Sequence, residues 1–432
     1  MESIWQNTSQ SVEFQMQSKD IKTDVLIIGG GLCGILCAYK LQQAGVSYVL
    51  AEADRIMGGI SENTTAKITF QHGLIYDRLI NTFGLKAARL YLKANMQALE
   101  EYRKMCEIID CDFADQDAFV YSMIDRRKIT AEVAAYNKLG VNAKFVGEIP
   151  LPFRCAGAVK VEGQAMFNPL KFAYSVAKGL NIFENTKVLE LKPKEVITNR
   201  GRIFAKNIIV ATHFPFLNKH GSYFLKLYQH RSYVIALKNA PEIDGMYVDE
   251  DKKGLSFRRY GEYLLLGGGS HRTGKKGGNW RELEAYAKKH YPDAREVARW
   301  ATQDCMSLDS VPYIGRYSKR TPNLFVATGF NKWGMTSSMV AANILADLVQ
   351  GKKNKYAALF SPSRSMLHPQ LLINAAESTI GLLTPTAPRC PHLGCALKYN
   401  PQEHSWDCPC HGSRFEKDGK LINNPATDDK SF

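Results

Sequence analysis

The sequence predicts an α/β protein with a small, separate C-terminal domain. Residues 24–52 pass from a continuous apolar run through a glycine-rich turn to helical spacing and then to a second apolar run, the pattern of a strand–helix–strand unit. Residues 323–349 repeat the order strand, glycine turn, helix. Residues 384–432 are rich in Pro, Gly and Asn and contain four of the ten cysteines. The first two observations indicate the α/β class, and the third indicates a metal-binding unit.

The composition excludes several classes of protein. With 432 residues, 45% of them hydrophobic and 23% charged, the chain is not disordered and can bury a large core. The net charge of +14 favours anionic ligands or an acidic partner, but it does not indicate nucleic-acid binding, because Lys and Arg are spread along the chain. The N-terminus has no apolar signal segment, and the stretch 25–38 is too short to span a membrane. We expect a cytoplasmic protein; the oligomeric state stays open.

The other elements follow from local patterns, in chain order. Residues 1–22 are polar and are expected to form an extension. Apolar residues at helical spacing predict a long surface helix over 84–109. Strand-like runs lie at 117–126, 187–212 and 228–268. Residues 351–383 are expected to form a linker and a helix, the helix beginning near residue 366.

A dinucleotide-binding fingerprint lies in the first strand–helix–strand unit. Gly29 permits the tight turn, Gly31 lets the backbone approach a pyrophosphate, and Gly34 lets the helix pack closely on the strand. Glu52 ends the second strand and is expected to accept hydrogen bonds from the adenosine ribose. Because the motif has its strand, helix and acid in the expected order, it predicts dinucleotide binding.

Later features favour FAD over NAD. Gly59 belongs to a second glycine pair after Glu52, Thr212 ends an apolar strand, and Gly329 opens a turn before a second helix. The start of that helix, at Gly334 and Met335, is expected to face the electron-rich pyrimidine edge of a flavin.

With these motifs the chain resembles the FAD-dependent amine and amino-acid oxidases, a family that includes glycine oxidase and sarcosine oxidase. The resemblance implies a discontinuous Rossmann-like FAD-binding domain over 23–75, 150–215 and 300–350. It also implies an interleaved substrate domain with an antiparallel sheet over 76–149 and 216–299. Val188 matches the position whose backbone contacts the adenine in that family.

The C-terminal cysteines and histidines form two metal-binding boxes. Cys390 and His392 form the first pair, and Cys408 and His411 form the second. These residues could bind one zinc ion tetrahedrally, or two irons with both Cys on one and both His on the other.

The two boxes resemble those of Rieske proteins of the cytochrome bc type. This resemblance implies a [2Fe–2S] cluster in a small all-β domain over 384–432 and a disulfide between Cys395 and Cys410. Phe415 stands where high-potential relatives have a tyrosine hydroxyl donor, which predicts a lower reduction potential. The domain lacks the usual sheet before its first box, so we expect it to lean on the flavoprotein body.

Together these features predict an FAD-dependent oxidoreductase acting on C–N bonds. It is expected to oxidise a small amine or amino-acid-like substrate and to relay electrons through the cluster. The cluster exchanges single electrons, which implies a one-electron acceptor or donor protein such as a ferredoxin. Candidate substrate-side residues are Arg231, Arg258, His271 and Arg272, since an arginine can clamp a carboxylate. The alternative is a non-catalytic electron-transfer or redox-sensing protein. A Rieske oxygenase is disfavoured, because it would need an iron site of two histidines and one carboxylate that the sequence does not offer.

Overall fold

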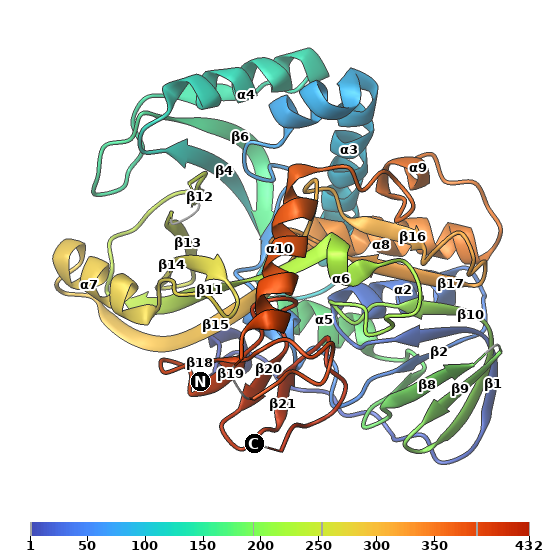
Figure 1. The fold of residues 1–432 in the computed structure, drawn as a ribbon. Helices are drawn as coiled ribbons and strands as arrows, with labels where there is room; N and C mark the ends of the chain where they lie inside the picture. Colours follow the sequence, from blue (N-terminus) through green and yellow to red (C-terminus); the bar gives the residue numbers. More distant parts are fainter. Residues whose placement is uncertain (1, 193, 252–253, 386–387, 432) are drawn as a thin grey trace.

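The computed structural model describes residues 2–192, 194–251, 254–385 and 388–431. They form two large sheets, a small four-stranded sheet and the helices that cover them (Figure 1). In Figure 1 the small sheet β18–β21 lies low in the view, between the β11–β15 region and the sheet that contains β1 and β10. The small domain therefore sits against the body, as the sequence predicts.

The first large sheet contains the strand–helix–strand unit. Its parallel strands run in the order β17, β10, β1, β2, β7; β16 pairs antiparallel with β17, and the β8–β9 hairpin pairs with β10 through β9. Parallel strands covered on both faces need apolar residues throughout, which explains the continuous apolar run before Gly29. The bounds of the strands are β1 Ile21–Ile28, β2 Tyr48–Ala51, β7 Ile182–Phe183, β8 Val188–Lys192, β9 Glu195–Thr198, β10 Gly201–Val210, β16 Tyr313–Arg316 and β17 Leu324–Thr328.

The second large sheet is mostly antiparallel. Its order is β15, β11, β14, β13, β12, β4, β6, β3, with β5 paired to β6. The bounds are β3 Lys67–Ile68, β4 Ala114–Ser122, β5 Lys144–Val146, β6 Gly157–Met166, β11 Leu227–Lys238, β12 Met246–Asp249, β13 Ser256–Tyr260, β14 Tyr263–Arg272 and β15 Arg295–Ser307.

The two sheets correct the predicted domain boundaries. The predicted FAD-binding domain includes residues 157–166, but β6 pairs with β4 in the second sheet. Likewise β15 crosses the predicted boundary at residue 300 and pairs with β11 along its length. An apolar strand has the same local pattern in either sheet, so the sequence did not show which partner it would take.

The helices cover the sheets and connect them. α2 and α8 pack on each other, and α8 also packs on α3. α3 begins earlier than the predicted helix and is kinked at Gly84, whose φ is 81°. The helix bounds are α1 Ile4–Asn7, α2 Leu32–Gln43, α3 Tyr76–Cys106, α4 Arg126–Leu139, α5 Pro169–Ala177, α6 Tyr223–Lys226, α7 Trp280–His290, α8 Gly334–Val349, α9 Ala357–Phe360 and α10 Pro369–Leu383, with a 3₁₀ turn at Ile60–Asn63. No helix in the described part of the chain is long and apolar enough to cross a membrane.

The chain ends pack more closely than predicted. Trp5, in the expected polar extension, is fully buried; its indole N–H donates to Thr64 O at 2.7 Å, and its ring meets Tyr260 edge-on at 4.7 Å. Residues 2–22 therefore belong to the folded body. The predicted helix after residue 366 is confirmed as α10, which leads into the small sheet. The small sheet contains β18 Lys398–Asn400, β19 Ser405–Asp407, β20 Arg414–Glu416 and β21 Leu421–Asn423, each paired antiparallel with the next.

Candidate functional site

A cavity of about 1100 Å³ lies where the two large sheets and the small domain meet. This volume is slightly above the ~300–1,000 Å³ usual for small-molecule sites, so the cavity suits a large cofactor together with a substrate. Gly34 and Gly329 lie outside its wall, and the other predicted cofactor residues lie in it: Gly29, Gly31, Glu52, Gly59, Val188, Thr212, Gly334 and Met335.

The glycine turn between β1 and α2 has the geometry that the fingerprint requires. Gly29 has φ +109°, and a Cβ there would lie 2.7 Å from Ala211 O. A Cβ at Gly34 would lie 1.9 Å from Gly29 O, so α2 approaches the turn more closely than any side chain permits. Gly31 is the N-cap of α2 and faces the cavity. The exposed backbone and the helix N-terminus form a site for a pyrophosphate.

Glu52 follows β2 and also faces the cavity. Its carboxylate accepts hydrogen bonds from the backbone N–H groups of Gly30, at 2.5 Å, and Asp54, at 3.0 Å. Burial raises the pKa of Glu52, and these two hydrogen bonds oppose the increase. The backbone thus holds the carboxylate next to the glycine turn, where it can meet a ribose.

At the other end of the cavity, the first residues of α8 face the space. Gly334 and Met335 begin this helix, and their amides are at its positive end. His72 stacks on Trp333 with ring centroids 5.1 Å apart, and its Nδ1 lies 2.7 Å from the Tyr91 hydroxyl. Burial lowers the pKa of His72 to about 3, so this imidazole is neutral. His72 therefore adds no charge to this end of the cavity, where the amides at the start of α8 offer oriented dipoles.

These residues fit FAD. A Cβ at Gly59 would have no atom within 4 Å, so the backbone there borders open space. The nucleotide fingerprint and the start of α8 lie in the wall of the same cavity. A dinucleotide with a flavin at its second end can therefore occupy both positions.

The four predicted iron ligands come together in the small domain. The Cys390 and Cys408 thiols hydrogen-bond to each other, and Nδ1 of His392 lies 3.3 Å from Nδ1 of His411. Sulfur thus faces sulfur and imidazole faces imidazole, the arrangement that places both Cys on one iron and both His on the other. The residues present fit a Rieske [2Fe–2S] cluster.

A second sulfur group lies next to these ligands. The sulfurs of Cys395, Cys408 and Cys410 lie within 4.8 Å of one another. Cys395 and Cys410, however, form a disulfide, so they lack the thiolates that a metal needs. The predicted disulfide is confirmed. It joins the loop that contains Cys390 and His392 to the loop that contains Cys408 and His411.

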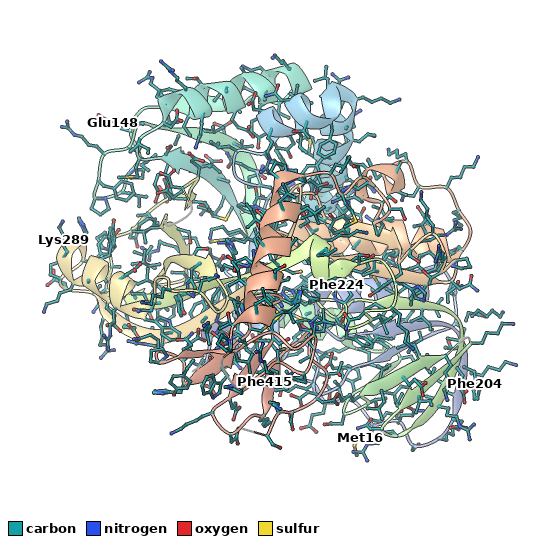
Figure 2. The ribbon with its side chains drawn as sticks, viewed as in Figure 1. Met16, Glu148, Phe204, Phe224, Lys289 and Phe415 are labelled. Atoms are coloured by element: carbon teal, nitrogen blue, oxygen red, sulfur yellow. A yellow bond between two sulfur atoms is a disulfide. The ribbon has the colours of Figure 1, made fainter. Side chains whose placement is uncertain are left out.

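The body of the protein contacts the cluster ligands directly. His392 Nε2 lies 2.8 Å from Asn218 Oδ1, an outer hydrogen bond that orients this ligand. The Phe214 and Phe224 rings meet His411 edge-on, with centroids 6.4 and 6.3 Å away. Figure 2 labels Phe224 on the body, above the small domain that contains Phe415. The cluster site is therefore partly enclosed by the flavoprotein body.

Two of the predicted substrate-side arginines bind the small domain instead of facing the cavity. Arg231 and Glu403 form a buried bidentate ion pair, in which Arg231 Nε lies 2.9 Å from Glu403 Oε1. Arg272 donates to the backbone carbonyls of Pro409 and Cys410 at 3.1 Å each. Both guanidinium groups therefore join the body to the domain that contains the cluster.

The other two predicted residues are held elsewhere in the body. Arg258 is fully buried, donates to Ala66 O at 2.8 Å and lies over the Trp5 ring. His271 Nδ1 lies 3.0 Å from Gly269 O. Neither residue lines the cavity, and neither do the two arginines that bind the small domain. The catalytic role of these four residues stays a prediction without geometric support.

The cavity wall contains charged residues that the sequence analysis did not single out. Lys67 donates to Thr65 Oγ1 at 3.1 Å and has no carboxylate partner among the described residues; burial lowers its pKa to about 7. Lys332 donates to Ser232 Oγ and Ser270 Oγ at 3.3 and 2.6 Å. It is accessible from the cavity but surrounded by protein, so burial lowers its pKa. No local motif marks either lysine, and the serines that bind Lys332 lie 62 and 100 residues away in the chain.

This geometry defines the class of the protein as a flavin-dependent oxidoreductase with an attached Rieske iron–sulfur domain. A family model described as FAD dependent oxidoreductase matches residues 24–348, and one described as Rieske [2Fe-2S] domain matches residues 366–432. The chain belongs to the FAD-dependent oxidoreductase family and binds FAD and a [2Fe–2S] cluster.

Similar proteins share the two-domain organisation or the fold of the body. YhfW of Bacillus subtilis (strain 168), named as a Rieske 2Fe-2S iron-sulfur protein, is 36% identical over 98% of this chain and 96% of its own length. Gamma-glutamylputrescine oxidoreductase of Escherichia coli (strain K12) is 25% identical over 80% of this chain and 88% of its own. The glycine oxidase structure from Geobacillus kaustophilus superposes with a TM-score of 0.67 at 19% identity, over 80% of this chain and all of that one. The last comparison shows the fold of the body alone.

Proposed function

We propose that this enzyme oxidises a small amino-acid-like substrate in the cavity and passes the electrons one at a time through the cluster to a ferredoxin-like acceptor. Bound FAD supplies two-electron chemistry, whereas the cluster exchanges one electron at a time. One observation supports the relay above all: consecutive residues, His213 and Phe214, extend from the cavity wall to both histidine ligands of the cluster.

The backbone turns at His213, between the cavity wall and the ring of Phe214. This residue has φ 63°, is half-buried, and lines the cavity. The Phe214 ring lies 6.3 Å from the His392 ring and 6.4 Å from the His411 ring. Asn424 of the small domain donates to Phe214 O at 2.7 Å, which fixes the segment against the cluster domain. Electrons that leave the cavity on this side therefore meet packed protein rather than solvent.

Two glutamines hydrogen-bond the loop that contains Cys408 and His411 to the sheet that covers the cavity. Gln229 Nε2 donates to His411 O at 2.8 Å, and Gln303 Nε2 donates to Gly412 O at 2.8 Å. Gln303 Nε2 also donates to Gln229 Oε1 at 2.7 Å. Because these side chains come from the neighbouring strands β11 and β15, the cluster keeps one position relative to the cavity.

The charges of the cavity favour an amino acid over a simple amine. The Lys67 ammonium group has no carboxylate partner among the described residues, so a substrate carboxylate would compensate its charge. Asp304, also in the wall, is surrounded by protein, and burial raises its pKa; Lys332 and Arg231 oppose the increase. Anaerobic mixing with matched amines and amino acids, followed by flavin absorbance, tests this preference. Reduction by amines alone would contradict it.

The relay is tested by removing the cluster without changing the cavity. His411→Ala should prevent cluster assembly, because one iron loses a ligand. His404→Asn is the matched control: His404 is exposed in the same domain, and its φ of 52° suits Asn. We expect His411→Ala to keep substrate-dependent bleaching of the flavin and to lose turnover with a one-electron acceptor, whereas the control keeps both. Full turnover of His411→Ala with that acceptor would refute the relay.

A further inference from the structure

The cavity is built from more than the FAD-dependent oxidoreductase body. Residues 420–424, Ala426, Thr427 and Asp429 of the small domain also line it. They share this wall with Glu52, Lys187 and Val188 of the body. We propose that segment 420–429 of the Rieske domain covers the adenosine end of FAD, so that the two domains build one cofactor site.

The position of the segment follows from its contacts with the body. The Lys187 ammonium group donates to Thr427 O. Lys187 directly precedes Val188, the residue predicted to contact the adenine through its backbone. It directly follows Thr186, whose N–H donates to Glu52 O at 2.8 Å. The segment therefore lies at the nucleotide end of the cavity, away from the start of α8.

The side chains of the segment suit an adenine nucleotide. Ile422 is 42% exposed, and it lines the cavity. An apolar side chain in that position can cover the flat face of a purine. Lys420 is exposed at the same wall and forms no ion pair with the described residues, so it adds an attractive charge for an anionic dinucleotide.

The same segment is joined to the cluster. Ala426 N donates to Ser413 Oγ at 3.0 Å, and Ser413 lies in the second cluster box. Asn424 Nδ2 donates to Thr212 O at 2.5 Å, on the body side of the cavity. Because the nucleotide would contact a segment anchored to both domains, binding of FAD should stabilise docking of the cluster domain, and docking should strengthen binding of FAD by the same factor.

The test compares FAD with FMN, which has the same flavin but lacks the adenosine monophosphate half of FAD. Apoprotein that keeps its iron is titrated with each flavin by fluorescence, for the wild type, Ile422→Ala, Lys420→Ala and the control Lys417→Ala. Lys417 is exposed on the same hairpin but does not line the cavity. We expect Ile422→Ala to weaken FAD binding about tenfold, as for the loss of one apolar contact, and Lys420→Ala by about threefold. FMN binding and the control should be unchanged.

Iron content and the visible circular dichroism of the cluster check that each variant keeps its fold. Hydrogen exchange gives an independent measurement: the amides of 420–429 should exchange more slowly with FAD than with FMN. Unchanged FAD affinity in both Ile422→Ala and Lys420→Ala, or equal weakening of FAD and FMN binding, would overturn the proposal. So would loss of FAD and iron in equal proportion, because the segment would then serve only the fold of the small domain.

Discussion

The ion pair between Arg231 and Glu403 allows a quantitative prediction about domain docking. Both side chains are nearly inaccessible, at 7% and 5% exposure. Glu403 also accepts hydrogen bonds from Arg414 Nη2 at 2.8 Å and the Tyr233 hydroxyl at 3.0 Å. Replacing Glu403 with Gln keeps the shape of the side chain and removes its charge. Arg414 keeps Asp407 as a partner at 2.9 Å, whereas Arg231 loses its carboxylate.

The expected cost follows from the charge that remains buried. Breaking a buried ion pair on one side costs about 3–5 kcal/mol, because the other charge stays uncompensated. Burial raises the pKa of Glu403, but the positive charges of Arg231 and Arg414 outweigh burial and lower this pKa to about 2. The folded pKa thus lies below the usual value, so the stabilisation is complete above about pH 4.5 and is lost only as the pH falls towards 2. At neutral pH the full penalty should appear.

Denaturant unfolding followed by the visible circular dichroism of the cluster measures this penalty. Glu416→Gln, an exposed change in the same domain, is the control and should alter stability by less than about 0.5 kcal/mol. The double variant Arg231→Met/Glu403→Met should recover much of the loss, because no unpaired charge remains. A loss below about 1 kcal/mol for Glu403→Gln would refute the view that this pair holds the domains together, since exposed pairs contribute that little.

Three further predictions concern the cofactors and the substrate. Gly34→Ala should lower the flavin-to-protein ratio severalfold at unchanged iron content, because the new Cβ would lie 1.9 Å from Gly29 O. An unchanged ratio would contradict the close approach of α2 to the glycine turn. The KM of an amino-acid substrate should rise as the pH increases through about 7, because Lys67 loses its charge there. Lys67→Met should raise KM about tenfold and abolish this pH dependence. A pH profile retained in the variant would exclude Lys67 as the group that binds the substrate carboxylate. Phe415→Tyr should raise the reduction potential of the cluster by about 40 mV, the effect of one hydrogen bond of about 1 kcal/mol on a one-electron couple. An unchanged potential in a potentiometric titration would show that the new hydroxyl makes no hydrogen bond to a cluster ligand.

The cofactor motifs could be read from the sequence because their geometry is local. The turn from Gly29 to Gly34 joins consecutive elements, and steric limits on the backbone set its residues whatever surrounds them. The two cluster boxes are similar: each places a Cys and a His within a few residues, and the four side chains lie together in the structure. Helix α10 was also recognisable, since its apolar spacing continues through a whole element.

The residues that surround these motifs could not be assigned in the same way. Arg231 has the pattern of a candidate substrate clamp, but its carboxylate partner lies 172 residues later in the chain, in the other domain. Three other features likewise depend on contacts between distant segments: the sheet that β6 joins, the contact of Phe214 with the cluster histidines, and the position of Ile422 in the cavity wall. Local spacing and backbone sterics act within a few residues, so they specify turns, helices and ligand boxes. Side-chain partners are chosen only when the chain folds and burial forces each charge and each apolar surface to find a match.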